Sequence, residues 1–286
     1  MNNTLISVLE KLEIELYKSL QYTDQNSKEY ILRIKDEITL IILCSKVLEY
    51  YKSNTDKSYR PRIYILILSH IYHKNEDQLR RIGEKLISQN VSDEYLKILA
   101  ENPEKFMNDI SNLLFSNSEE KSKLKAILLL ITSYCLMNKY NKAHNFFKKC
   151  NYFDLITHLK DENIKILYNR TMVQLGLCAF RNGNYQDSLF YLMPLCQMGT
   201  SKLKEYLSQS YNKEMEKSIF FDKEDKKRII PFIMIINIDE VECTFYLASL
   251  LLDLPKVLLY KLGKSSGNTV NLVFKKLMDN FEKQVI

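Results

Sequence analysis

The sequence has few of the residues that interrupt helices. Its 286 residues include only 6 glycines and 5 prolines, and tryptophan is absent. Average usage would be about 7% glycine and about 5% proline. Tight turns must therefore be few, and glycine-rich phosphate loops are nearly excluded. Hydrophobic residues make up 46% and charged residues 27%, so the chain can bury a continuous core and is not a disordered protein.

Motifs of enzymes and cofactor sites are also missing. The sequence has no G-x-S-x-G, no Walker lysine loop, no G-x-G-x-x-G and no H-E-x-x-H. Acidic pairs such as Glu119-Glu120 lie in polar turns, where solvated surface explains them better than acid catalysis. We therefore expect no enzymatic activity, no cofactor, no metal ion and no small-molecule substrate.

The cysteines and histidines do not have the spacing of a metal site. No C-x-x-C pair occurs, and each cysteine lies in or beside an apolar stretch, which favours reduced thiols buried in the core. The six are Cys44, Cys135, Cys150, Cys178, Cys196 and Cys243. His70 and His73 share a helix face, but no cysteine is near enough in sequence to complete a site. An interface or capping role is favoured for both histidines.

Targeting signals are not evident either. Residues 1–4 lack a basic segment of the signal-peptide type. The longest apolar runs, such as 63–68 and 126–131, are far shorter than the ~20 residues that cross a bilayer. The sequence therefore predicts a protein of the cytosol or nucleus without a membrane partner.

Helical periodicity runs through residues 1–122, which we predict to be an N-terminal helical region. Apolar residues recur at intervals of three and four. Predicted helices cover 5–20, 29–52, a segment beginning at Pro61, and 76–88. Repeated Asn, Ser and Pro residues in 89–122 predict short helices with mobile connections.

Residues 123–286 are predicted to form paired helices. Helix 124–137 would pair with 141–149, and 164–181 with 185–195. The two pairs superpose at a shift of 45 residues, with Asn138 on Gly183 at the turn and Tyr140 on Tyr185. Helix-pair repeats have periods of roughly 34–47 residues. The pattern predicts an all-α fold of tetratricopeptide-like hairpin repeats, in which the small residues Gly176 and Ala179 allow close packing.

The C-terminal part is harder to interpret. The β-branched residues of 229–237 suggest a strand, but Pro231 interrupts it. We predict a buried extended segment that leads into a helix over 239–252, which Pro255 ends. One more amphipathic helix is expected over 272–285, and residues 256–286 carry a net charge of +4. No clear winged helix follows the repeats.

Basic residues outnumber acidic ones by 41 to 35, which leaves a net charge of +6. Lysine supplies 33 of the 41, and it suits phosphate contact better than base reading. Lys139, Lys142, Lys148 and Lys149 surround a predicted turn and helix that also hold aromatics, an arrangement that can bind RNA. The favoured alternative is that the aromatic side chains belong to the core of the hairpin and that the lysines lie on its solvent-exposed face.

A second candidate phosphate site is the predicted helix start at Pro61. Arg60 and Arg62 flank this proline, and a helix N-terminus attracts anions. A solvated loop end explains the same residues equally well. The abundance of Lys, Asn, Ile and Tyr also matches codon bias from an AT-rich genome, which weakens any argument from lysine content alone.

Three segments resemble one known family. Leu-Tyr-Asn-Arg-Thr-Met-Val-Gln-Leu-Gly-Leu-Cys-Ala-Phe at 167–180 is similar to a segment of the C subunit of eukaryotic translation initiation factor 3. The upstream segment 26–37 and one downstream segment, which comprises 236–243 followed by 250–255, resemble that family in the same order. A generic helical repeat would not reproduce this combination.

The resemblance implies a non-catalytic scaffold. The family builds a helical arch that usually ends in a winged helix, together called a PCI module. It pairs with the A subunit, and the assembled factor sits on the small ribosomal subunit during initiation. A cytoplasmic protein that contacts other proteins of the factor, a ribosomal protein and the rRNA backbone is therefore expected.

The chain departs from the family pattern at both ends. It lacks the family's long N-terminal extension, and only about thirty residues follow the segment at 254–255. We expect a shortened form or a fragment, and the AT-rich composition favours the former. The alternatives are a PCI-type scaffold of another complex and a stand-alone ribosome-binding protein of the dormancy type.

Overall fold

The computed structural model describes residues 2–52, 60–89, 94–117, 120–149, 161–209 and 231–263. These residues form helices and no strand, which confirms the all-α prediction. The first half contains α1 (Asn2–Tyr22), α2 (Lys28–Lys52), α3 (Arg60–Ile71), α4 (Glu76–Ser88), α5 (Glu94–Glu101) and α6 (Pro103–Asn117). The second half contains α7 (Glu120–Leu136), α8 (Tyr140–Lys149), α10 (Glu162–Arg181), α11 (Tyr185–Cys196), α12 (Thr200–Tyr206), the 3-10 turn η3 (Phe232–Met234) and α14 (Ile238–Lys261).

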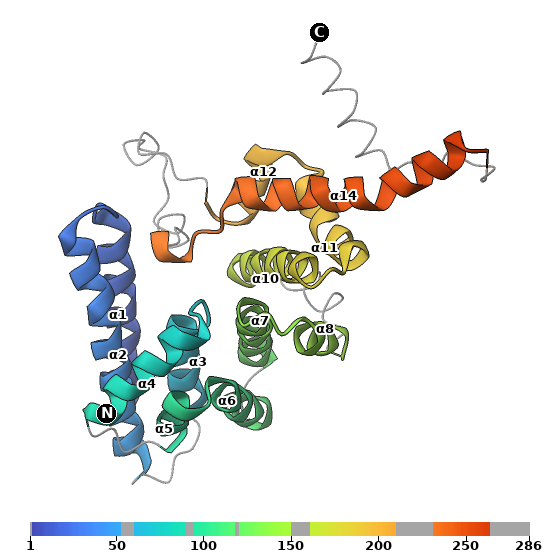
Figure 1. The fold of residues 1–286 in the computed structure, drawn as a ribbon. Helices are drawn as coiled ribbons and strands as arrows, with labels where there is room; N and C mark the ends of the chain where they lie inside the picture. The colour runs from blue at the N-terminus through green and yellow to red at the C-terminus, as the bar shows by residue number, and fades with distance from the viewer. Residues whose placement is uncertain are drawn as a thin grey trace.

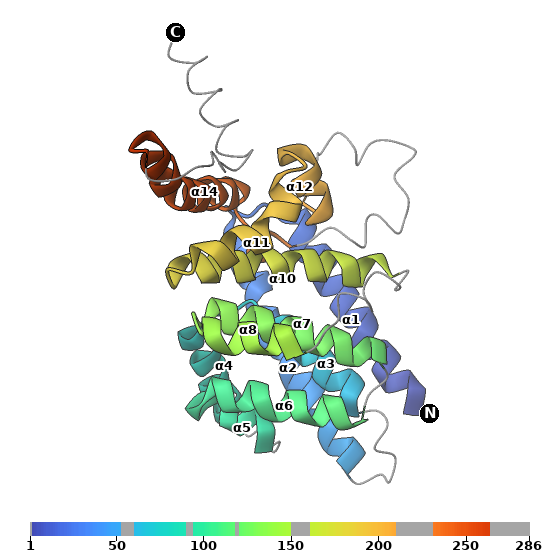
Figure 2. The same cartoon turned by 90° about the vertical axis from the view of Figure 1, so that its right-hand side faces the viewer.

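The helices stack in the order of the chain. Helix α6 packs on α7, α7 on α10, α10 on α11, and α11 on α14. Helix α8 returns against α7, and the long α1–α2 hairpin runs along the side of the stack beside α3 (Figures 1 and 2). One hydrophobic core follows the stack from Ile6 in α1 to Phe245 in α14. The predicted boundary between 1–122 and 123–286 stays a prediction.

The two helical hairpins have the same turn. Asn138 and Gly183 both have positive φ, 57° and 78°. In each turn the next residue's N–H bonds the carbonyl five positions back, from Lys139 to Tyr134 at 2.9 Å and from Asn184 to Ala179 at 2.9 Å. This is the left-handed ending that favours Gly or Asn. The alignment of the two turns is therefore confirmed.

Close packing in the second hairpin depends on Gly176. A Cβ atom at this position would lie 2.5 Å from the Cγ of Leu192 in α11. The prediction that a small residue lets α10 and α11 approach is therefore confirmed. A similar approach occurs at Gly83, where a Cβ would lie 2.4 Å from the backbone nitrogen of Ala100; it was not predicted.

The prediction of short helices over 89–122 is wrong for its second half. Helix α6 has 15 residues, because Phe106, Met107, Ile110 and Leu114 form a fully buried face against the stack. The interrupting Ser111 is accommodated, since its hydroxyl donates to the carbonyl of Met107 at 2.6 Å.

The segment before α14 differs from the prediction. It contains the turn η3, and its side chains alternate, with Met234 and Ile236 buried and Ile233 and Ile235 exposed. Residues 229–230 and the predicted helix 272–285 lie outside the described residues.

Pro255 does not end α14, which continues to Lys261. Pro255 lies on the exposed side of the helix together with Leu251. The carbonyl that the missing N–H would have bonded can therefore be hydrated, and the interruption is tolerated.

The cysteine prediction is correct for four of the six. Cys44, Cys135, Cys178 and Cys196 are buried free thiols. Cys243 is exposed, because it lies on the outer face of α14 opposite the buried Val241 and Phe245. Cys150 lies outside the described residues.

Candidate functional site

Two of the predicted lysines converge on a carboxylate. Lys139, in the α7–α8 turn, has its Nζ 2.5 Å from Oε2 of Glu104 in α6. Lys142, in the first turn of α8, pairs with the other oxygen of the same carboxylate. The hydrogen bonds from both lysines lower the pKa of Glu104. Half of the candidate basic surface is therefore joined to α6, and one of its charges is neutralised.

Lys148 and Lys149 are directed outward. Both are exposed in the last turn of α8, where the negative end of the helix dipole favours cations. No described residue forms an ion pair with either of them. These two lysines are consequently the part of the predicted surface that is free to meet an anion among the described residues.

The aromatic residues of α8 belong to the core, as the alternative interpretation held. Tyr140 is buried. Phe146 stacks on Tyr134 with 5.8 Å between ring centres, and Phe147 meets Tyr191 edge-on at 5.5 Å. These rings are not available to stack on bases. Phe190 of α11 is 67% exposed, which the sequence did not reveal because its neighbours in the pattern are core residues.

A polar network connects α8 to α11 beneath the lysines. The hydroxyl of Tyr140 donates to Oδ2 of Asp187 at 2.7 Å, and Nδ1 of His144 lies 2.7 Å from the hydroxyl oxygen of Tyr191. Burial and the bonded carboxylate raise the pKa of Tyr140. Burial and the nearby Lys148 lower the pKa of His144. The network fixes α8 on α11 and thereby fixes the position of its terminal lysines.

Arg62 lies beside a charged cavity near the start of α7, at the other end of this helix from Lys139. Its Nη2 is 2.6 Å from Oε1 of Glu10 in α1, so an internal carboxylate already engages this predicted phosphate ligand. The cavity has a volume of about 460 Å³ and its lining also includes Glu13, Lys125 and Asp161. Burial lowers the pKa of Lys125 and raises that of Glu13. Arg60 is half-buried at the start of α3.

The two predicted basic groups do not form one patch. Arg62 shares its cavity with Lys121 and Lys125, in the first turns of α7. Lys139 follows the last turn of the same helix. A helix of 17 residues is about 25 Å long at ~1.5 Å per residue, so the two groups lie near opposite ends of α7.

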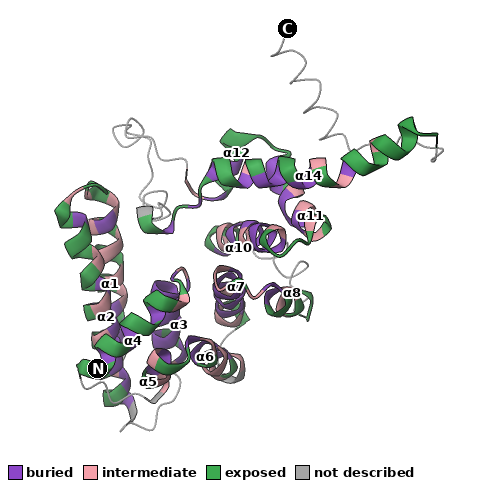
Figure 3. Cartoon of the chain, viewed as in Figure 1, coloured by how far each residue is buried: buried purple, intermediate pink, exposed green. Residues whose placement is uncertain are grey.

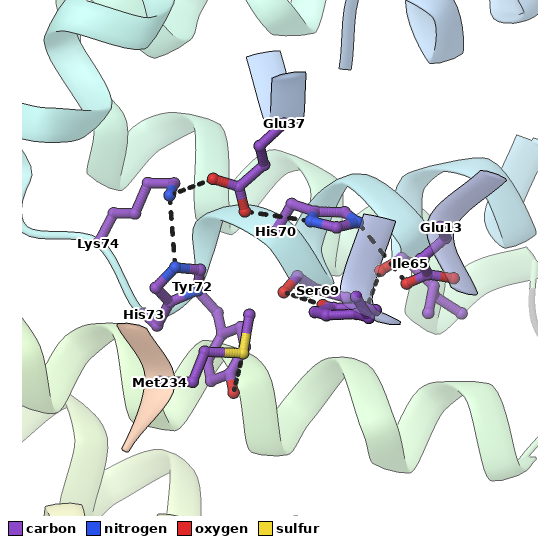
Figure 4. Close-up of polar contacts among 10 residues, drawn as sticks. Glu13, Glu37, Ile65, Ser69, His70, Tyr72, His73, Lys74 and Met234 are labelled. Carbon is purple, nitrogen blue, oxygen red and sulfur yellow. Dashed lines mark hydrogen bonds and ion pairs between the residues drawn. The ribbon is translucent and has the colours of Figure 1, made fainter. Parts of the chain in front are cut away.

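A buried ionic cluster holds the N-terminal hairpin on the stack (Figure 4). Glu37 of α2 accepts from Lys74 at 2.6 Å, and its other oxygen lies 3.1 Å from Nδ1 of His70 in α3. The other ring nitrogen of His70 is 3.7 Å from Glu13 of α1. Thus His70 occupies an interface between three helices, as its favoured interpretation held.

The buried cluster shifts the pKa values of two of its side chains. Burial would raise the pKa of Glu37, but the hydrogen bond to His70 and the charge of Lys74 outweigh it and lower the pKa to about 2. Burial and the adjacent Lys74 lower the pKa of His73 to about 3. No group of three or more candidate metal ligands occurs among the described residues. The geometry is that of a structural ion pair.

A clasp that the sequence did not predict joins the segment 231–237 to the rest of the chain. Arg170 of α10 is buried and donates to the carbonyl oxygens of Met234 and Leu207. The hydroxyl of Tyr30 in α2 accepts from the backbone N–H of Ile233 at 3.2 Å. The only signal for this role was a charged residue, Arg170, directly beside the apolar positions of the predicted helix 164–181.

Helix α14 is long and unusually apolar. It is the one helix of the described residues whose length and composition would suffice to cross a membrane, with a mean hydropathy of 1.4. The expectation of no membrane-spanning segment rests on uninterrupted apolar runs such as 63–68. Helix α14 is longer than these runs because polar residues interrupt its apolar sequence. The core helix of a protein can meet the same criterion, and the first half of α14 is packed on α11.

Comparison with known proteins agrees with the resemblance in the three segments. The family model of the N-terminus of eukaryotic translation initiation factor 3 subunit 8 matches residues 1–261. The C subunit of the same factor from Chaetomium globosum is 31% identical over an alignment of 298 positions, which covers 99% of this chain. The Drosophila melanogaster C subunit is 29% identical over an alignment of 264 positions, which covers 88% of this chain.

The chain spans about a third of these relatives. It covers 34% of the Chaetomium protein and 27% of the Drosophila protein. The match nevertheless runs from the first residue through α14, so it includes every described helix. The chain therefore belongs to the family of the N-terminal region of the C subunit of eukaryotic translation initiation factor 3.

Proposed function

We propose that this chain is a non-catalytic scaffold of eukaryotic translation initiation factor 3, which assembles with other subunits, notably the A subunit, and binds the small ribosomal subunit in the cytoplasm. The observation that carries the proposal is the family match across residues 1–261. The similar proteins from Chaetomium globosum and Scheffersomyces stipitis are C subunits of that factor, which supports the same role for this chain.

The stacked helices support a scaffolding mechanism. Each helical pair buries one face on its neighbours and leaves ridges exposed. The Arg170 clasp and the Glu37 cluster join segments far apart in the sequence, which favours a rigid body. A rigid body can hold several partners at fixed distances without any chemical step.

The proposed ribosome contact consists of Lys148 and Lys149, with Lys139 and Lys142 beside them. Arg60 and Arg62 are the second, separate candidate at the start of α3. Exposed lysines meet the rRNA backbone without reading its sequence, so binding should weaken as salt is raised. The pairing of Lys139 and Lys142 with Glu104 gives these two a smaller expected share of the affinity.

The proposal is tested by affinity purification of the tagged full chain from its own cells, followed by mass spectrometry. We expect the A subunit of the factor and small-subunit ribosomal proteins in the eluate. Lys148→Glu with Lys149→Glu should lower retention of small ribosomal subunits about tenfold while the A subunit is retained. Lys11→Glu with Lys18→Glu, on exposed positions of α1, is the matched control and should change neither. Eluates without any other protein of the factor would contradict the proposal.

A further inference from the structure

Two buried cysteines meet where α7 packs on α10. Cys135 lies in the last turn of α7 and Cys178 in the last turn of α10, and the two helices lie side by side with buried residues between them (Figure 3). Both residues are fully buried and both thiols are free. The thiol of Cys135 donates a hydrogen bond to the sulfur of Cys178. The contact between the two helical hairpins therefore contains a dithiol.

The sulfur of Cys178 is covered by exposed polar side chains. The side-chain nitrogen of Asn182 lies 3.7 Å from this sulfur, and the side-chain oxygen of Asn138 lies 3.8 Å from it. The guanidinium of Arg181 also hydrogen-bonds the sulfur. All three side chains are exposed at the hairpin turns, and exposed side chains change rotamer within nanoseconds. A molecule as small as hydrogen peroxide can reach the thiol when one of them rotates away.

These contacts distinguish Cys178 from the other buried thiols. Burial raises the pKa of Cys44 and that of Cys196 to about 12. For Cys178, the hydrogen bond from Cys135 and the charge of Arg181 outweigh burial and lower the pKa to about 7. The thiolate is the nucleophilic form of cysteine. Among the buried thiols that the structure describes, Cys178 is therefore the one that reacts most readily at neutral pH.

We propose that Cys178 is an oxidation site for hydrogen peroxide and that Cys135 converts the product into a disulfide between α7 and α10. The Cys178 thiolate attacks one peroxide oxygen, the O–O bond breaks, and the sulfur becomes a sulfenic acid. The hydroxide that leaves takes up the proton released by the thiol. The sulfur of Cys135 then attacks the sulfenic sulfur, the S–O bond breaks, and the second hydroxide leaves as water with the Cys135 proton. In total, two thiols lose two electrons and one peroxide is reduced to two molecules of water.

The surroundings of Cys135 set the order of the two steps. Burial, together with the hydrogen bond and the charge of Cys178, raises the pKa of Cys135. Cys135 therefore stays protonated while Cys178 is a thiolate, and it loses this electrostatic opposition when Cys178 becomes an uncharged sulfenic acid. The resulting disulfide would join the α7–α8 hairpin covalently to the α10–α11 hairpin. The proposal does not depend on the proposed role in translation initiation.

Limited oxidation of the full chain tests the proposal. The protein is treated with hydrogen peroxide at about pH 7, near the pKa of Cys178, the remaining thiols are alkylated, and the unreduced digest is analysed by mass spectrometry. We expect the disulfide between Cys135 and Cys178 to form at least tenfold faster than Cys44 or Cys196 is oxidised, and dithiothreitol should reverse it. Oxidation of Cys178 no faster than that of Cys196, or disulfides only between two copies, would overturn the proposal.

Serine variants separate the roles of the two cysteines. Cys135→Ser keeps a hydrogen-bond donor beside Cys178, so Cys178 should accumulate as a sulfenic acid that dimedone captures. Cys178→Ser should leave Cys135 reduced. The matched control is Cys196→Ser, which removes a buried thiol with a raised pKa and should form the disulfide at an unchanged rate. Oxidation of Cys135 that is as fast in Cys178→Ser as in the unsubstituted protein would contradict the assigned order.

Discussion

Single charged residues decide how the N-terminal hairpin is held. Glu37 is 4% exposed and is the only carboxylate among the described residues that contacts both His70 and Lys74. Two buried groups would lose their acceptor if it were removed, whereas their desolvation would remain. Such a buried pair is therefore more sensitive to the loss of one partner than the surface ion pairs of the described residues.

Glu37→Gln should destabilise the protein by about 3–5 kcal/mol, the usual cost of breaking a buried ion pair on one side. Urea unfolding measures this as a lower free energy of unfolding. Asp36→Asn is the control, since Asp36 is exposed and lies 3.9 Å from Arg33, and a change within about 0.5 kcal/mol is expected. Equal effects of the two substitutions would mean that the buried cluster does not stabilise the hairpin.

Acid should weaken the fold in two successive ranges. The pKa of His73 is about 3 in the folded protein, below its ordinary value of about 6.5. The unfolded chain therefore takes up a proton first, and the free energy of unfolding falls as the pH drops below about 6.5. Glu37, with a folded pKa of about 2, adds a second loss below about pH 4.5.

His73→Gln should remove the first of these losses and keep the second. The measurement is the urea midpoint at a series of pH values from about 7 down to about 4, which spans the ordinary pKa values of both side chains. A slope between about pH 6.5 and about pH 4.5 that His73→Gln leaves unchanged would show that another group is responsible.

The hairpin turn tests backbone strain at one residue. No atom lies within 4 Å of a Cβ built on Gly183, whose φ is 78°, so only its φ opposes a side chain. Gly183→Val should cost about 1–3 kcal/mol, measured as a lower midpoint of thermal unfolding. Gly183→Asn should be much milder, because Asn138 adopts φ 57° in the equivalent turn. Similar midpoints for both variants would contradict a role for strain.

At the scale of elements, the sequence predicts helices well where their apolar face is regular. The predicted 76–88 coincides with α4, and 164–181 begins two residues inside α10. The turn at Asn138 was predictable because a left-handed residue has few alternatives. The full length of α6 was not predicted, because polar residues interrupt its apolar pattern in the sequence. Packing against the neighbouring helices makes burial of its apolar face favourable.

The interactions between distant elements could not be predicted from the sequence. The sequence pattern predicts a basic surface at Lys139 and Lys142, but Glu104, thirty-five residues before Lys139, accepts hydrogen bonds from both. It also predicts a phosphate ligand at Arg62, but this side chain forms an ion pair with Glu10 of α1. Such pairs depend on which helices meet in space, which periodicity within one helix does not reveal. The outward direction of Lys148 was predictable because it follows from helix geometry alone.

The clasp between α10 and the segment before α14 yields a prediction for this scale. Arg170→Met should cost about 2–4 kcal/mol, because the buried carbonyls of Met234 and Leu207 lose their donor. Hydrogen exchange should rise first in the amides of 231–245. Lys165→Met, on the exposed side of the same helix, should leave exchange and stability nearly unchanged. Equal exchange rates of the amides of 231–245 in the two variants would exclude a local clasp.

At the scale of the molecule, the stack joins both parts of the chain into one body. The core extends from α1 to α14, and the clasp and the buried ionic cluster connect residues that are far apart in the sequence. The lysines of α8, the cavity beside Arg62 and the exposed Leu251, Leu254 and Leu258 of α14 occupy separate places on this body. A scaffold that engages several partners requires such separate surfaces.

We propose that this chain works within initiation factor 3 on the small ribosomal subunit. The decisive measurement is a sucrose gradient of native lysate, with mass spectrometry of each fraction that carries the chain. We expect the chain to sediment with the small ribosomal subunit together with other proteins of the factor, and to leave this fraction as salt is raised. Sedimentation with whole ribosomes without any other protein of the factor, or absence from every ribosomal fraction, would contradict the claim.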